Sequence, residues 1–296
     1  MVSRAFARLA AGLVAALVFC LSDPSQAAHP LRLTDYSPQS RIGLEAAYGR
    51  MKEPLPADLL HYLLEVDANI HAGLHLRLGL PFSGYSGAGG ADNFIRGNLL
   101  VGASYDWPLA DFFSLGFGLR LYLPTYERAD PIDVGVPQDP RRAALAQWHY
   151  RFQYALEDGF PVVPELAARF RYAGFYTQLE GAFTWAPNVR ESDEAARKAN
   201  ITLLQYGVGI GYDVLGYVEF GASFTGLVDP ASSGANLGDA LGLPVDRPRS
   251  LHAATVGVRG QYKWFAARFE TTLPLDSRHW EMLAPTYIGA LQTQFP

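Results

Sequence analysis

Charged side chains recur in this sequence inside segments that are otherwise apolar, and they take alternate positions there. In the segment 113–123, Arg120 alternates with leucines and phenylalanines, and its side of the segment also carries Gly116 and Gly118. A β-strand directs successive side chains to opposite faces, so the segment predicts one polar face and one apolar face. Arginines on a polar face can bind carboxylate or phosphate groups through paired hydrogen bonds, and they can also pair with glutamates.

The same alternation assigns further charged residues to the polar face of other segments. Charge facing hydrocarbon would be very costly, so we expect these residues to line an enclosed interior. They are Arg77, Arg120, Arg169, Arg171, Arg268, Glu45, Glu65, Glu180 and Glu270. Small residues on this face, such as Gly118, are expected to tolerate serine at little cost. Because arginines outnumber acids in the interior set, one interpretation is a pore that favours anions. The other is a network of Arg–Glu pairs that fills a small lumen.

Catalytic chemistry is weakly indicated. Ser104, Ser114 and Ser223 face inward near the short turns, whereas His61 and His252 lie near the long loops, so these residues cannot form a triad. Ser83 follows a different pattern, since it begins a glycine-rich loop that could meet His61 at the rim. We therefore predict no enzyme and no catalytic residue, and keep a rim hydrolase as the third hypothesis.

Metal, cofactor and nucleic-acid sites are not predicted. His71 and His75 stand four residues apart on the predicted interior face, and at the strand rise they would be about 13 Å apart, too far to chelate one ion alone. The only cysteine is Cys20, so no thiolate site or disulfide framework is available. The formal net charge of −5 disfavours a nucleic-acid partner.

Strand-like alternation extends over nearly the whole chain and predicts twelve strands. Each is close to the roughly 9 to 11 residues that a tilted membrane strand requires. The predicted strands are 41–49, 60–68, 72–82, 94–106, 113–123, 164–172, 175–185, 201–213, 217–227, 251–262, 265–273 and 286–295. An even number of strands places both chain ends on one side.

The connections between these strands alternate between short turns and long polar loops. Short turns are predicted at 67–70, 108–111, 173–174, 214–216 and 263–264, and the longest loop is 124–163. Aromatic residues gather at the strand ends, as they do where amphipathic rings meet a membrane interface. The belt residues that we single out are Trp107, Tyr172, Tyr212 and Trp264. A soluble barrel with aromatic corners is the alternative.

The first 28 residues read as a secretory signal peptide. Arg4 and Arg8 precede an apolar run from 9 to 21, and Ala27 and Ala28 supply a cleavage site. Residues 29–40 are predicted to form a polar periplasmic leader, and residues 41–296 the barrel. Beyond the signal, no stretch of the sequence is long and apolar enough for a transmembrane helix.

Together these features resemble the outer-membrane β-barrel superfamily of Gram-negative bacteria. The last strand carries Tyr287, Leu291 and Phe295 on one face, like the C-terminal strand that the barrel-assembly machinery recognises in that superfamily. The resemblance implies an all-β, twelve-stranded antiparallel transmembrane β-barrel in the outer membrane, with short periplasmic turns and long extracellular loops. It also implies outer-membrane lipid and the assembly machinery as partners.

The longest loop contains one predicted helix, residues 140–158. Asp139 can cap it, Pro140 suits its first position, and Trp148 and Phe152 belong to an apolar stripe. This stripe must be covered, either inside the mouth, where it would constrict the lumen, or along the rim. Both placements remain open.

The sequence therefore predicts a porin-like channel for passive transport of small polar, and in one interpretation anionic, solutes. A plugged barrel that acts through its loops in adhesion or envelope structure is the alternative. The sequence does not identify the solute or the oligomeric state.

Overall fold

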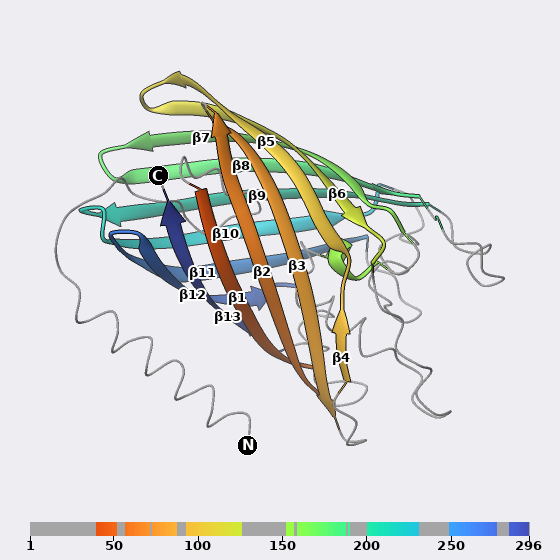
Figure 1. The fold of residues 1–296 in the computed structure, drawn as a ribbon. Coiled ribbons are helices and arrows are strands. Elements are labelled where there is room, and N and C mark those ends of the chain that lie inside the picture. The colour runs from red at the N-terminus through yellow and green to blue at the C-terminus, as the bar shows by residue number, and fades with distance from the viewer. Residues whose placement is uncertain are drawn as a thin grey trace, which may run out of the picture.

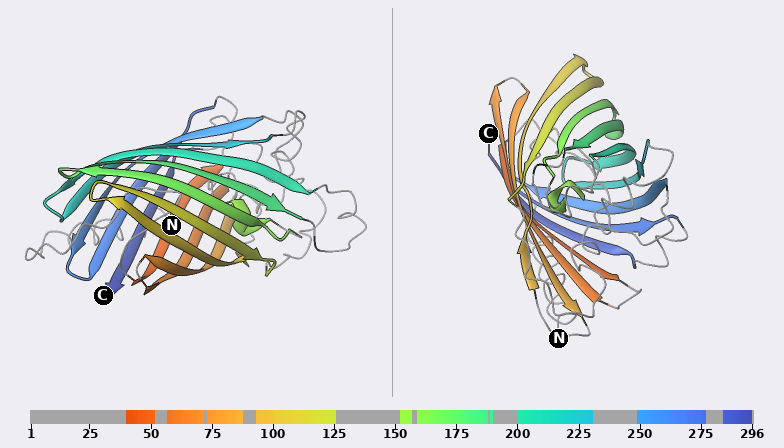
Figure 2. Two further views of the ribbon diagram at one scale, coloured as in Figure 1. Left: turned by 90° about the horizontal axis from the view of Figure 1, so that it is seen from above. Right: turned by 90° about the vertical axis from the view of Figure 1, so that its right-hand side faces the viewer.

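The computed structural model describes residues 40–51, 57–71, 73–87, 93–125, 152–156, 159–187, 189, 200–230, 249–276 and 284–295. These residues form one antiparallel sheet that closes on itself (Figures 1 and 2). The predicted signal peptide, the leader up to residue 39 and much of the longest loop lie outside the described residues. No helix in the described part of the chain is long and apolar enough to cross a membrane.

Thirteen strand segments and one short 3-10 helix, η1, make up the described fold. They are β1 (Ser40–Met51), β2 (Ala57–His71), β3 (Leu74–Gly87), β4 (Asn93–Arg96), β5 (Leu99–Ala110), β6 (Phe113–Leu123), η1 (Phe152–Ala155), β7 (Val162–Tyr172), β8 (Phe175–Ala186), β9 (Ile201–Val214), β10 (Val218–Val228), β11 (Ser250–Tyr262), β12 (Phe265–Pro274) and β13 (Thr286–Phe295).

Neighbouring strands in sequence are neighbours in the sheet, and the first strand closes the ring by pairing with the last. β1 pairs with β13 from Ser40 opposite Phe295 to Tyr48 opposite Tyr287, and its other edge pairs with β2. β4 and β5 both pair with β3, so they occupy a single position in the ring. The result is the predicted twelve-stranded all-antiparallel barrel, closed by the pairings of β1 with β13 and of β2 with β3.

Residues that alternate along each strand point alternately into the barrel and away from it. Along β9, Leu203 and Gln205 are buried, whereas Leu204, Tyr206 and Val208 are exposed. Among the described residues, many leucine, valine and phenylalanine side chains are exposed on the outer face. This is the surface that a membrane barrel turns to hydrocarbon, with polar residues inside.

Tight turns at one end of the barrel keep the hairpins short. Ala173 and Gly174 both have positive φ angles, 48° and 80°, and join β7 to β8 as a two-residue turn. Leu215 and Gly216, at 56° and 77°, lie in the three-residue turn 215–217 that joins β9 to β10. Such turns twist in the same sense as the strands they connect. The predicted turns at 173–174 and 263–264 are confirmed, and the turn predicted at 214–216 lies at 215–217.

The first predicted short turn is placed wrongly. β2 continues to His71, and residues 67–69 pair with residues 75–77 of β3. The sequence Asp-Ala-Asn suggested a turn because these residues favour turns locally, but cross-strand pairing with β3 overrides that preference. His71 and His75 therefore lie on two different strands.

The predicted strand 94–106 is interrupted at Gly97 and Asn98, which separate β4 from β5. The backbone amide of Asn98 donates a hydrogen bond to the Tyr154 carbonyl oxygen at 2.6 Å, and the backbone amide of Gly97 donates to the Pro81 carbonyl oxygen at 3.0 Å. The strand pattern breaks because the backbone at Asn98 binds a segment of the longest loop instead of continuing the ladder.

The loop helix predicted at 140–158 is not an α-helix in its described part. Residues 152–155 form the 3-10 helix η1, and residues 126–151, which include Trp148, lie outside the described residues. The apolar stripe correctly predicted a buried apolar surface, but the described residues form a 3-10 helix instead of an α-helix. Backbone carbonyl groups of this segment accept hydrogen bonds from the barrel wall.

Candidate functional site

The candidate site is the barrel interior. The strand registers place all nine predicted interior charges on the inner face, since each lies opposite another inward residue, as Glu45 lies opposite Leu63 and Ala290. Arg77, Arg120, Arg169, Glu45 and Glu270 are buried. Arg171, Arg268, Glu65 and Glu180 are half-buried.

One ion-pair cluster forms between β2 and β3. Arg77 approaches Glu65 (Nε to Oε1, 3.1 Å) and Asp67 (Nη2 to Oδ2, 2.9 Å). The other oxygen of Asp67, Oδ1, lies 2.9 Å from His75 Nδ1, and Arg41 approaches Oδ2 at 3.4 Å. Asp67 was missed by the sequence analysis because it fell in the misplaced turn. The inward alternation that includes His61 and Glu65, extended by two residues, would have placed Asp67 on the inner face.

Further pairs cross other parts of the interior. Arg120 Nε lies 2.7 Å from Glu165 Oε2, and both side chains are buried. Arg268 on β12 contacts Glu45 on β1, past the intervening strand β13. The Nε atom of Arg268 lies 3.1 Å from Glu270 Oε1. Buried charges are tolerated when they are paired in this way.

A third arrangement lies near the short turns. Both terminal nitrogens of Arg169 donate to the Asp106 carboxylate, at 3.0 and 3.2 Å. Beside this pair, a cavity of about 170 Å³ is lined by side chains that include Asp106, Arg169 and Arg171. Asp106 was also missed, because it stood at the end of its predicted strand.

The inner face carries more acids than the sequence analysis assigned to it. Asp67, Asp106 and Asp213 face inward with the glutamates, and Asp213 lies opposite Glu219 on β10. The described arginines of the inner face are Arg41, Arg77, Arg120, Arg169, Arg171, Arg259 and Arg268, and they no longer outnumber the acids. The excess of arginines that suggested an anion-favouring field is therefore wrong for the described lumen as a whole.

Residues 152–156 of the longest loop lie inside the barrel. The Asn98 side chain donates to the carbonyl oxygens of Gln153 (3.1 Å) and Leu156 (2.7 Å). Gln153 Nε2 donates to Thr184 Oγ1 at 2.9 Å and to Gln205 Oε1 at 2.7 Å. Because Asn98 belongs to the β4–β5 interruption and Thr184 and Gln205 belong to β8 and β9, the segment is attached to two separated parts of the wall.

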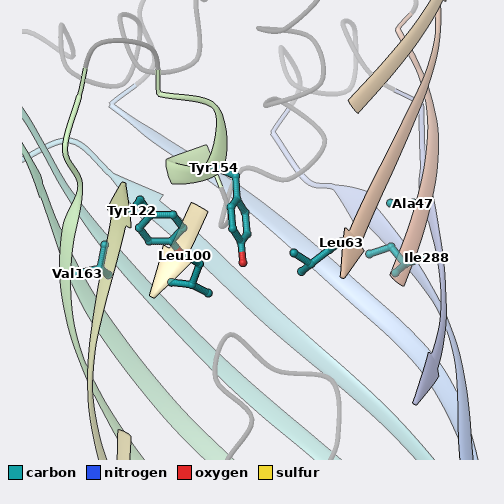
Figure 3. Close-up of a cluster of buried hydrophobic side chains, with 7 residues drawn as sticks. All are labelled: Ala47, Leu63, Leu100, Tyr122, Tyr154, Val163 and Ile288. Carbon is teal, nitrogen blue, oxygen red and sulfur yellow. The ribbon is translucent and has the colours of Figure 1, made fainter. Parts of the chain in front are cut away.

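Apolar contacts reinforce this attachment. Phe152 and Leu156 pack against inward-facing Leu203, Leu227 and Leu251. Tyr154 joins a second buried cluster together with Ala47, Leu63, Leu100, Tyr122, Val163 and Ile288. Figure 3 shows Tyr154 between the group of Tyr122, Leu100 and Val163 and the group of Leu63, Ala47 and Ile288, which come from different strands of the ring. We call residues 152–156 the inserted segment.

Ser83 and His61 do meet. Ser83 belongs to β3 rather than to a loop, and its Oγ lies 2.7 Å from His61 Nδ1. The neighbours of His61 on the inner face, Ala47, Leu59 and Leu63, are apolar. Among the described residues no group of three His, Cys, Asp or Glu side chains could hold a metal ion.

The residues predicted to contact the membrane lie on the outer face. Trp107, Tyr172, Tyr212 and Trp264 are exposed, and all four lie at the end of the barrel where the short turns are. On β13, Tyr287 is also exposed and Leu291 is half-buried, while the backbone of Phe295 pairs with Ser40.

Comparisons with known proteins identify the fold. No family model and no curated protein sequence matches the chain. A COG4313 outer membrane channel from Pseudomonas putida F1 is similar in structure, with a TM-score of 0.58 and 12% identity over 93% of this chain and 100% of that one. The NanC porin has a TM-score of 0.52 and 8% identity over 85% of this chain and 100% of its own. The chain thus has the closed antiparallel β-barrel fold of Gram-negative outer-membrane channels and porins.

Proposed function

We propose that this protein is an outer-membrane channel of a Gram-negative bacterium, through which small polar solutes diffuse without energy coupling. The observation that carries the proposal is the set of charged and polar side chains buried on the inner face, along strands whose outer face carries leucine, valine and aromatic residues. A barrel that only needed to be filled would be filled more cheaply by apolar side chains, because burying ion pairs costs desolvation energy.

The proposed route is narrow, and the inserted segment is its constriction. Phe152 and Tyr154 project among inward-facing side chains near the long loops, and the segment is attached by side-chain hydrogen bonds from Asn98 and Gln153. The segment is held to the wall by such hydrogen bonds, each contributing about 1 kcal/mol, and by the burial of Phe152 and Leu156. We propose that its displacement widens the passage.

Anion preference over the whole lumen is not part of the proposal. The field of Arg77, Arg120 and Arg169 is offset at short range by Asp67, Glu165 and Asp106. We propose instead that selectivity is weak and is set by the balance within each pair.

Single-channel recording in a planar bilayer tests the proposal. Replacing residues 141–156 with a short glycine linker should raise the conductance several-fold while leaving strand content unchanged by circular dichroism. The control is an equal-length deletion of residues 232–247 from another long loop, which should leave conductance near that of the wild type. Equal conductance in all three proteins would place the constriction elsewhere.

A plugged barrel is the second candidate, and one observation favours it. Tyr154 belongs to a buried apolar cluster whose other members lie on both sides of it, so side chains occupy part of the lumen at this level (Figure 3). If neither the wild type nor the 141–156 deletion conducts, the channel proposal fails and function through the long loops is favoured.

We also propose how the chain reaches this membrane. The first 28 residues would direct export and be removed, and β13 would present Tyr287 and Leu291 to the barrel-assembly machinery. Export of a chain that lacks residues 1–28 would be expected to fail, which fractionation of expressing cells can measure.

A further inference from the structure

Two glycines of the barrel wall leave the space that Tyr154 of the inserted segment occupies. A Cβ atom at position 97 would lie 2.5 Å from the Tyr154 carbonyl oxygen, and one at position 79 would lie 2.7 Å from the Tyr154 hydroxyl oxygen. Non-bonded heavy atoms are in contact at about 3.5 to 4 Å, so a side chain at either position would displace Tyr154. We call the space over Gly79 and Gly97 the Tyr154 niche.

The inserted segment, and not the wall, requires glycine at position 97. The φ angle of Gly97 is not positive, so alanine can adopt the same backbone conformation there. The atom in the way is a backbone oxygen of Tyr154, which cannot rotate aside as the end of a side chain can. The other close atom is Cγ of Pro81 at 2.9 Å, and this contact exists within the wall whether or not the segment is present.

Displacement at this point disturbs several hydrogen bonds at once. The Tyr154 carbonyl oxygen accepts from the Asn98 backbone amide at 2.6 Å. The side chain of the same asparagine donates to the carbonyl oxygens of Gln153 and Leu156, on either side of Tyr154. Because one wall residue binds three carbonyl groups of the segment, moving Tyr154 away from Gly97 weakens all three bonds together.

The Tyr154 side chain fixes the depth of the segment in the barrel. Its ring lies edge-on to Tyr122, with ring centroids 5.0 Å apart and an interplanar angle of 80°, in the buried cluster that Figure 3 shows. Its hydroxyl group ends over Gly79 on β3, whereas its carbonyl group lies over Gly97 at the β4–β5 interruption. These two ends of one residue define the docked position of the segment.

We infer that the Tyr154 niche holds the inserted segment in the barrel, and that a methyl group placed in the niche releases the segment from the wall. The inference deepens the proposed function, on which it rests for its consequence, by naming the wall positions that hold the constriction. Release of the segment can be measured without ion current, so the two can fail separately.

Cysteine labelling of the segment measures its release. The only cysteine of the sequence is Cys20, so Cys20→Ser together with Leu156→Cys gives a parent chain with one thiol, on the segment. Leu156 is 4% exposed, so the thiol should react slowly with a polar maleimide while the segment is docked. Gly97→Ala should raise the labelling rate about tenfold or more, because the open state is more populated. Gly289→Ala is the matched control and should label at the parent rate, since a methyl group there meets no atom within 4 Å.

Gly79 allows a rescue experiment. Gly79→Ala should raise the labelling rate less than Gly97→Ala does, because the hydroxyl end of a tyrosine side chain can move. Tyr154→Phe removes the hydroxyl group from the same space. Adding Tyr154→Phe to Gly79→Ala should therefore lower the rate again toward that of the parent, and a double variant that labels as fast as Gly79→Ala would contradict the inference.

A chain in which a short glycine linker replaces residues 141–156 separates the segment from the Pro81 contact. In that chain Gly97→Ala should leave stability in a urea titration unchanged. If Gly97→Ala prevents folding with and without the segment, the glycine serves the wall and the inference is overturned. Equal labelling rates for Gly97→Ala and Gly289→Ala would also overturn it. If Gly97→Ala prevents folding only when the segment is present, the Gly79 series decides. Faster labelling of variants that carry no current would leave the niche established and would reject the channel proposal alone.

Discussion

The carboxylate of Glu165 lies over Gly118 on the neighbouring strand, in the space that a side chain at position 118 would occupy. From there it reaches Arg120, two residues along the same face of β6, at 2.7 Å. The glycine is therefore what admits this buried ion pair, and the expectation that Gly118 tolerates a larger residue is wrong.

Gly118→Ala should destabilise the barrel by about 1 to 3 kcal/mol, because the added methyl group must push the Glu165 carboxylate away from its position. Urea titration of the protein in lipid vesicles measures the change. Gly289→Ala is the control, since a methyl group there meets no atom within 4 Å, and it should change stability by less than about 0.5 kcal/mol. Equal effects would mean that Glu165 is not held over Gly118.

Leu119 provides the corresponding test of the outer face. Its side chain is exposed at 44% and lies near the middle of β6. Leu119→Arg should cost about 2 to 4 kcal/mol in the same vesicle titration, because the charge would face hydrocarbon near the bilayer midplane. Leu119→Phe keeps an apolar surface and should cost far less. A small cost for arginine would argue against lipid contact at this position.

The Arg169–Asp106 pair allows selectivity to be tested in both directions. Arg169→Gln leaves an uncompensated acid near the short turns, so the permeability ratio should move toward cations. Asp106→Asn leaves an uncompensated arginine and should move the ratio toward anions. Reversal potentials in a salt gradient measure both shifts, which should be largest at low salt, where screening is weakest. Shifts of the same sign in both variants would contradict a local balance of charge.

Asn98 should control how firmly the inserted segment is held. Asn98→Ala removes two side-chain hydrogen bonds to the segment, so it should increase current fluctuations or the open conductance without changing strand content. Asn69→Ala is a suitable comparison, because Asn69 lies at the opposite end of the barrel, where its backbone amide bonds to Ser40. Indistinguishable recordings from the two variants would separate the segment from conduction.

The alternation in the sequence determined the architecture and the direction of the side chains. The two-residue period is a property of each strand by itself. Strands that each have one apolar face, over almost the whole chain, can form only a closed barrel in lipid or a sheet with a packed core. For this reason Arg77, Arg120 and Arg169 could be assigned to the interior before any contact was known. Ala173 and Gly174 were likewise recognisable as a turn, because their conformation depends on neighbouring residues only.

Only the tertiary structure decided the partners of those side chains and the contents of the lumen. Arg268 meets Glu45 across 223 positions of sequence, and Asn98 meets Leu156 across 58. The local sequence pattern does not predict such contacts, because they depend on the registers of several strands at once. The same reason explains the two largest departures from expectation. Asp67 stays in β2 because β3 pairs with it, and the strand containing Asn98 breaks because the inserted segment takes its backbone hydrogen bond.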